Sequence, residues 1–145
     1  MTGSAPILRP REVFARMQQR WLHNDPGFQE DLLAEDAVIE APFAPAGRPS
    51  RFVGRKEFLA FARPAWSAFP VRFTACRTLA IHDTSDPEVI VVEYELTGTH
   101  TTTGHQATAG FVGVLRVRNG TIVHWREYQN TAAIAAALAP PPATG

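Results

Sequence analysis

The second half of the chain contains four stretches that are rich in β-branched and aromatic residues and are separated by short connections. They cover residues 71–81, 88–98, 106–118 and 121–129, and each has the composition of a strand. The connection Asn119-Gly120 is a strong hairpin signal, because a type I′ turn needs a positive φ at both central residues. The sequence therefore predicts a run of four long strands.

The first half of the chain has a mainly helical pattern. A short helix is predicted over 28–35, a short strand over 37–41, and a helix over 55–69 that Pro64 should kink or split. Because helices come first and long strands follow, we predict an α+β fold in which helices cover one face of an antiparallel sheet. The first helix, which starts at Pro10, carries an apolar stripe at helical spacing: Val13, Phe14, Met17, Trp21 and Leu22.

Length and charge restrict the domain organisation and the classes of partner. The 145 residues fit one domain, which we assign to residues 10–138, with disordered ends over 1–9 and 139–145. The chain has 14 Lys and Arg against 14 Asp and Glu, whereas proteins that bind nucleic acid normally have a basic excess or a basic face. We therefore expect no nucleic-acid partner.

Several other classes of protein and site are also disfavoured. A single cysteine, Cys76, excludes an intramolecular disulfide. No apolar stretch is long enough for a membrane span, and the N-terminal residues lack the pattern of a secretory signal, so we expect a cytoplasmic protein without a membrane partner. His100 and His105 lack a third metal ligand at a known spacing. No glycine-rich phosphate loop is present, and we predict neither a cofactor nor a metal.

Several segments together resemble a known family. They are WLHND, LLAEDAVIEAPFAP, VVEYELTGTH and RVRNGTIVHWREYQN. The chain is similar to the SnoaL-like branch of the superfamily named after nuclear transport factor 2 (NTF2), and WREYQN is similar to a motif of phenazine-biosynthesis A/B proteins. The resemblance implies a cone-shaped α+β fold in which a curved sheet and helices enclose one pocket. It also implies a homodimer and a small, mostly apolar ligand.

The active-site patterns of this superfamily are only partly present. Where ketosteroid isomerases have a catalytic aspartate and a tyrosine, this chain has Ala41 and Met17. The arginine of limonene-type epoxide hydrolases falls near Glu93 and Glu95, and the histidine of the phenazine proteins falls at about Phe61. One catalytic acidic residue of these enzymes does have a counterpart in this chain. In the comparisons with the epoxide hydrolases, the SnoaL-type cyclases and the phenazine proteins, the resemblance places this residue at Glu127.

The strand pattern gives an independent reason to consider Glu127. Strand alternation places it on one face with Trp125 and places Arg126 on the other. A carboxyl group beside an indole in an apolar pocket has a raised pKa and can accept and return a proton near neutral pH. The alternative is that Glu127 lies at the edge of the sheet and forms an ion pair with an arginine elsewhere.

We therefore predict a cofactor-independent enzyme that binds a small hydrophobic cyclic or polyketide-like molecule. Glu127 would act as its general acid/base in cyclisation, isomerisation or dehydration. The alternatives are a non-catalytic binding module and a dimeric interaction domain with a filled pocket. Glu93 could be a second pocket carboxylate or part of a solvated strand surface. The predicted substrate-binding residues are Trp125, Glu93, Trp66, Phe61, Phe43 and Met17.

Overall fold

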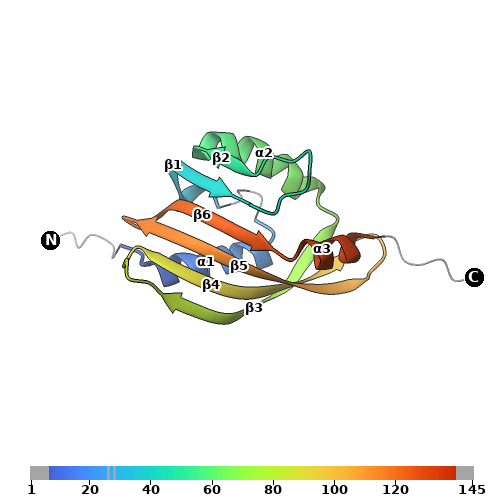
Figure 1. Cartoon of the computed structure of the whole chain (residues 1–145). Coiled ribbons are helices and arrows are strands. Elements are labelled where there is room, and N and C mark those ends of the chain that lie inside the picture. The colour runs from blue at the N-terminus through green and yellow to red at the C-terminus, as the bar shows by residue number, and fades with distance from the viewer. Residues whose placement is uncertain (1–6, 26, 28, 140–145) are drawn as a thin grey trace, which may run out of the picture.

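A computed structural model describes residues 7–25, 27 and 29–139. Its sheet has six strands in the order β2-β1-β6-β5-β4-β3 (Figure 1). The helices are α1 (Pro10–Leu22), α2 (Arg55–Ala68) and α3 (Thr131–Leu138), and a 3₁₀ turn spans Glu30–Leu32. The strands are β1 (Leu33–Glu40), β2 (Arg51–Val53), β3 (Val71–Asp83), β4 (Val89–His100), β5 (Gln106–Arg118) and β6 (Thr121–Gln129).

The α+β class and the four long strands are confirmed, with one difference in the sheet. Strands β3 to β6 pair with their neighbours along the chain in antiparallel fashion. Strand β1 instead lies parallel to β6, with Ile39 opposite Trp125, so the sheet is mixed. Short connections can join only antiparallel neighbours, whereas about 80 residues lie between β1 and β6 and leave their relative direction free.

The hairpin between β5 and β6 has the predicted geometry. Asn119 has a φ of 52° and Gly120 a φ of 80°, as a type I′ turn requires. The turn fixes which residues of the two strands lie opposite each other. Next to the turn, Val117 lies opposite Ile122, and an irregularity between Arg116 and Val117 then shifts the register by one residue. The turn and this shift together place Glu127 opposite Gly113 and Trp125 opposite Leu115.

The boundaries of the first half differ from the prediction in three places. The expected helix over 28–35 is only a 3₁₀ turn, and β1 already begins at Leu33; Phe28 lies outside the described residues. The short strand β2 follows the proline-rich loop and is absent from the prediction. Helix α2 continues through Pro64 without being split, because this proline is exposed and the carbonyl group that it leaves without a partner can bind water.

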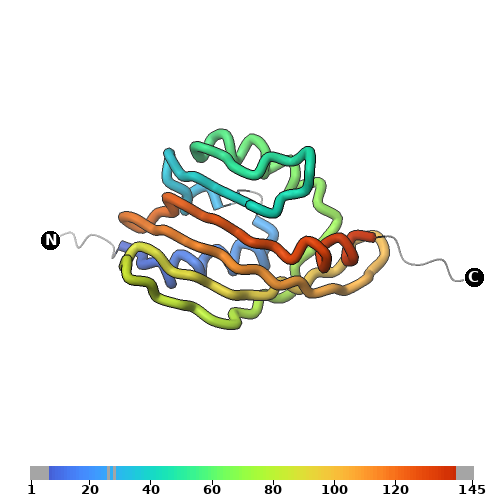
Figure 2. Tube along the Cα trace, in the orientation of Figure 1, coloured from blue at the N-terminus to red at the C-terminus, as the bar shows by residue number. Residues whose placement is uncertain are grey.

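The helices divide the sheet into an inner and an outer face. Helix α1 lies behind the sheet in Figure 1, and α2 lies above β1 and β2, while the face toward the viewer carries no helix over its centre. The Cα trace in Figure 2, in the same orientation, shows α1 behind the sheet and α2 above it. The core lies between the inner face and the helices, and its largest fully buried side chains are Tyr94, Phe14, Leu115, Ile122, Val13 and Val92.

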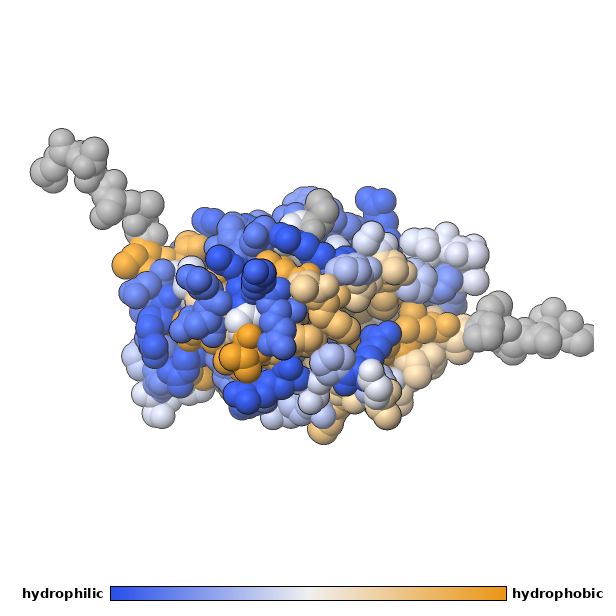
Figure 3. All heavy atoms as spheres, turned by 90° about the horizontal axis from the view of Figure 1, so that it is seen from above, coloured by the Kyte–Doolittle hydropathy of each residue, from blue (hydrophilic) through white to orange (hydrophobic). Residues whose placement is uncertain are grey.

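The molecule also has hydrophobic side chains on its surface. Figure 3 looks from the side of α2, and an orange area extends across the right half of this view. Phe61 on α2 and Val53 on β2 are 38% and 58% exposed. Within the described residues, no helix is long and apolar enough to cross a membrane.

Candidate active site

Glu127 lies on the inner face of β6, and both of its carboxyl oxygens accept a hydrogen bond. Oη of Tyr94, on β4, donates to Oε2, and Nε2 of Gln129 donates to Oε1 at 2.8 Å. Gln129 lies two residues after Glu127 and therefore on the same face of the strand. Both donors are neutral, so the carboxyl group is bound without a positively charged partner in this triad of Tyr94, Glu127 and Gln129.

Tyr94 is held in place by aromatic rings on both sides. Its ring is stacked on Trp21 at 5.4 Å and on Phe111 at 5.3 Å, with interplanar angles of 16° and 14°. Phe14 contacts it in an edge-on arrangement at 5.4 Å. Because the side chain has no exposed surface, its hydroxyl group has a fixed position relative to Glu127.

Burial shifts the pKa values of both members of this pair. Loss of solvent raises the pKa of Glu127, although the hydrogen bonds from Tyr94 and Gln129 act in the opposite direction. The pKa of Tyr94 is raised well above its ordinary value, first by burial and then by the neighbouring carboxylate. Tyr94 therefore stays protonated and donates to Glu127 throughout the usual pH range.

Trp125 provides part of the apolar environment of Glu127. It is 7% exposed and contacts Trp21 and Tyr94 at ring distances of 6.4 Å. Its indole lies against Gly113, where an added Cβ would be only 2.2 Å from Cη2 of the ring. A glycine at this position is what lets the indole lie flat on β5, next to the carboxyl group.

The alternative in which Glu127 forms an ion pair with an arginine is not found among the described residues. None of the ion pairs that they form involves Glu127. The two hydrogen bonds to Glu127 come from the neutral groups of Tyr94 and Gln129, and loss of solvent raises its pKa.

Two other predicted ligand-binding residues lie on the inner side of the sheet. Met17 on α1 is 3% exposed and belongs to the core. Trp66 on α2 is half-buried and packs against Phe73 at a ring distance of 5.6 Å. Trp66 therefore keeps some surface that a ligand could contact, whereas Met17 is enclosed by other core residues.

Three predicted residues lie away from Glu127. Glu93 is on the outer face, where it pairs with His82 at 2.6 Å, and the residue of β4 that faces Glu127 is Tyr94. Phe43 is 58% exposed and contacts Tyr128, which strand alternation also places on the outer face. Of the two alternatives for Glu93, this position fits the one in which it is part of a solvated strand surface, and the role of Glu93 and Phe43 in ligand binding stays a prediction. Phe61 is an exposed residue of α2 that packs on Phe52 at 5.0 Å.

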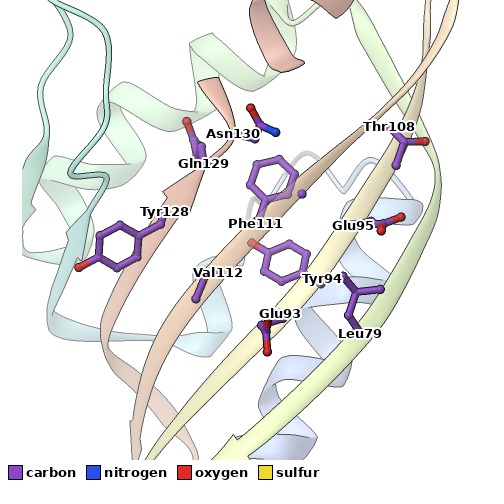
Figure 4. A pocket seen from close by; sticks show the side chains of 11 residues that line it. Leu79, Glu93, Tyr94, Glu95, Thr108, Phe111, Val112, Tyr128, Gln129 and Asn130 are labelled. Atoms are coloured by element: carbon purple, nitrogen blue, oxygen red, sulfur yellow. The ribbon is translucent and has the colours of Figure 1, made fainter. Parts of the chain in front are cut away.

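A groove lies on the outer face of the sheet (Figure 4). This open groove has a volume of about 500 Å³ and is lined by residues of β3 to β6, including Leu79, Glu95 and Tyr128. Strand alternation puts these side chains on the side opposite Glu127. The groove also borders on the triad, because Tyr94 and Gln129 are among its lining residues together with Phe111.

The sequence prediction does not include Tyr94 and Gln129. Strand alternation groups Tyr94 with Leu96 as the apolar side of its strand, and it places Gln129 on the face of Glu127 without giving it a role. The signal that could have found Tyr94 is a residue with a hydroxyl group on the buried face of a central strand, because such a group needs a hydrogen-bond partner.

Comparison with known proteins gives this site a family context. The SnoaL-like domain family matches residues 14–125 of the chain. The chain belongs to the SnoaL-like family. A PhzA/B-like protein of Pseudomonas aeruginosa, itself uncharacterised, is 33% identical over 100 residues, which is 69% of each of the two chains.

Solved structures agree with this family membership. A candidate isomerase of Bacillus subtilis superposes with a TM-score of 0.79 at 23% identity and covers 88% of this chain and 91% of its own. IdmH of Streptomyces antibioticus, a candidate polyketide cyclase, superposes with a TM-score of 0.70 at 22% identity over 90% and 99% of the two chains. At these identities the similarity shows the fold alone. The SnoaL-like fold expected from the sequence is thereby confirmed.

Proposed function

We propose that this SnoaL-like protein is a cofactor-independent enzyme in which Glu127 is the general acid/base. The substrate would be a small hydrophobic cyclic or polyketide-like molecule, and the reaction a cyclisation, isomerisation or dehydration. All three reactions need a group that removes a proton next to a carbonyl group and returns it elsewhere. The observation that carries the proposal is the half-buried carboxyl group of Glu127, which has a raised pKa and no ionic partner within the described residues.

The surroundings of Glu127 support a ligand with a flat ring. Phe111 and Trp66 are only partly buried, in contrast to Tyr94, which is stacked directly beneath Phe111. Partly exposed aromatic rings bind planar apolar molecules well, because stacking adds to the gain from burial. We therefore place the substrate against Phe111, next to Glu127 and Gln129.

The second candidate function is a binding module that sequesters such a molecule without converting it. The partly exposed rings of Phe111 and Trp66 favour it, because they would hold a ligand whether or not a proton is transferred. The two functions differ in what Glu127 contributes. A catalytic carboxylate acts on the transition state, whereas a binding site needs only its shape and polarity.

The test is the variant Glu127→Gln, which keeps the size of the side chain and removes its acid/base chemistry. We expect it to bind cyclic ketones with the affinity of the wild type, measured by quenching of tryptophan fluorescence, and to lose all conversion of them. A carbon NMR titration of labelled glutamates would provide a second measurement. A pKa of Glu127 at or below its ordinary value of about 4.3 would favour the binding module.

A further inference from the structure

The two oxygens of Glu127 differ in their access to a ligand. Oε2 accepts the hydrogen bond from Tyr94, whose side chain is fully buried and fixed between Trp21 and Phe111. Oε1 accepts a hydrogen bond from Gln129, which is half-buried and near the end of β6. A carboxylate oxygen can accept two hydrogen bonds, so Oε1 keeps one free position on its more open side.

Gln129 has a second hydrogen on the nitrogen that binds Glu127. A primary amide carries two N–H groups, and one of them donates to Oε1 at 2.8 Å. No hydrogen bond of the other N–H group is found within the described part of the chain, and the side chain of Gln129 is only half-buried. This N–H group is thus available to a ligand that binds next to Oε1. Figure 4 shows Gln129 on β6, to the upper left of the neighbouring rings of Phe111 and Tyr94, and all three residues line the same groove.

We propose that Gln129 is a catalytic residue, namely the hydrogen-bond donor to the carbonyl oxygen of the substrate while Oε1 of Glu127 removes the proton from the adjacent carbon. This inference rests on the proposed function and adds a residue to it. In the step, the C–H bond breaks and its electron pair forms a carbon–carbon double bond. The electron pair of the carbonyl group moves to its oxygen, and the proton forms an O–H bond at Oε1.

The spacing of the two groups suits this step. An acidic C–H group and the carbonyl oxygen beside it are close neighbours in any ketone, and Oε1 and Nε2 of Gln129 lie only 2.8 Å apart. During the step, negative charge moves from Oε1 of Glu127 to the carbonyl oxygen of the substrate. The amide group of Gln129 can donate one hydrogen bond to each of these two oxygens and so stabilise the charge before and after the transfer. A donor fixed in advance at the position where charge develops is an effective means of catalysis.

The main alternative is that Gln129 only holds the side chain of Glu127 in position. Both roles predict slower turnover when Gln129 is replaced, but they differ in the size of the effect. Loss of one donor to a developing oxyanion reduces kcat by about 10²–10³-fold. A merely positional role leaves Glu127 held by Tyr94, which is itself held by two rings, and so predicts a small effect on rate.

The test is proton exchange, which needs no knowledge of the natural substrate. We would incubate 2-tetralone, a cyclic ketone with a planar ring, in D₂O and follow the exchange of its α-hydrogens by NMR. The variants are Gln129→Met, which keeps the length and removes the donor, and Glu127→Gln. The matched control is Gln18→Met, because Gln18 also faces the inner side of the sheet but donates to Cys76 and Thr78.

The proposal expects exchange by Gln129→Met to be slower than by the wild type by about 10²–10³-fold, with the affinity for 2-tetralone retained and Gln18→Met unchanged. Exchange by Gln129→Met within about threefold of the wild-type rate, with Glu127→Gln inactive, would overturn the role of Gln129 and leave the proposed function intact. A wild type that exchanges no faster than Glu127→Gln would overturn the proposed function and this inference with it. Thermal melting of each variant confirms that it is folded.

Discussion

The packing of Trp125 on Gly113 makes the substitution Gly113→Ala a sensitive test of how the site is built. The added Cβ would lie 2.2, 2.6 and 3.0 Å from three carbons of the indole, whereas carbon atoms in contact are about 3.5–4.0 Å apart. The rigid ring would have to move by more than about 1 Å, against Trp21 and Tyr94 on its other sides. Overpacking of a core costs about 1–3 kcal/mol, and we expect the upper end of that range.

The assay is thermal and urea unfolding of the variant beside the wild type. A loss of about 3 kcal/mol lowers the Tm of a domain of this size by roughly 5–10 °C. The matched control is Gly110→Ala in the same strand, where an added Cβ has no atom within 4 Å; its stability should change by less than about 0.5 kcal/mol. Equal melting temperatures for the two variants would refute the packing described for Trp125. A displaced indole should also change the near-UV circular dichroism of the variant.

Two further predictions concern pH and assembly. Because the pKa of Glu127 is raised in the folded state, the folded protein binds more protons than the unfolded chain between the two pKa values, and its stability falls as pH rises through that window. Glu127→Gln should therefore gain stability relative to the wild type as the pH rises from the ordinary glutamate pKa of about 4.3 through the raised pKa of the folded protein. The measurement is urea unfolding at a series of pH values, and a difference in stability that does not change with pH would contradict this prediction. If a second copy covers the outer face, Val112→Lys, at a residue that is 37% exposed there, should lower the dimer fraction in sedimentation velocity. Ser67→Lys on the exposed side of α2 should leave it unchanged.

The parts of the fold that depend on local pattern could be predicted from the sequence. The hairpin at Asn119-Gly120 follows from the φ values that its two residues can adopt, and the helix after Pro10 follows from its apolar stripe. The parallel position of β1 could not be predicted, because it depends on a pairing between strands that lie far apart in the chain. The composition of residues 33–40 carries no information about the direction of their partner.

In the candidate site, too, the features within one strand could be predicted, whereas the contacts between strands could not. Glu127 could be identified because its residue type and its neighbour Trp125 are visible within one strand. Its partner Tyr94 is 33 residues away, and the contact exists only when β4, β5 and β6 are in register. The two alternatives for Glu93 have the same origin, since the sequence shows an acidic residue beside Tyr94, whereas the pleat of β4 decides that it lies on the opposite face.

The position of β1 also has a consequence for the order in which the molecule assembles. Strands β3 to β6 are joined by short connections, so they can pair soon after each is synthesised, whereas β1 must wait for β6, almost at the end of the chain. Contacts between distant segments form late because closing a long loop costs entropy before any contact is gained. Docking of β1 brings Ile39 beside Trp125. The pairing of Ile39 with Trp125 is thus made in one of the last steps of folding, and a nascent chain that lacks β6 has neither this pairing nor Glu127.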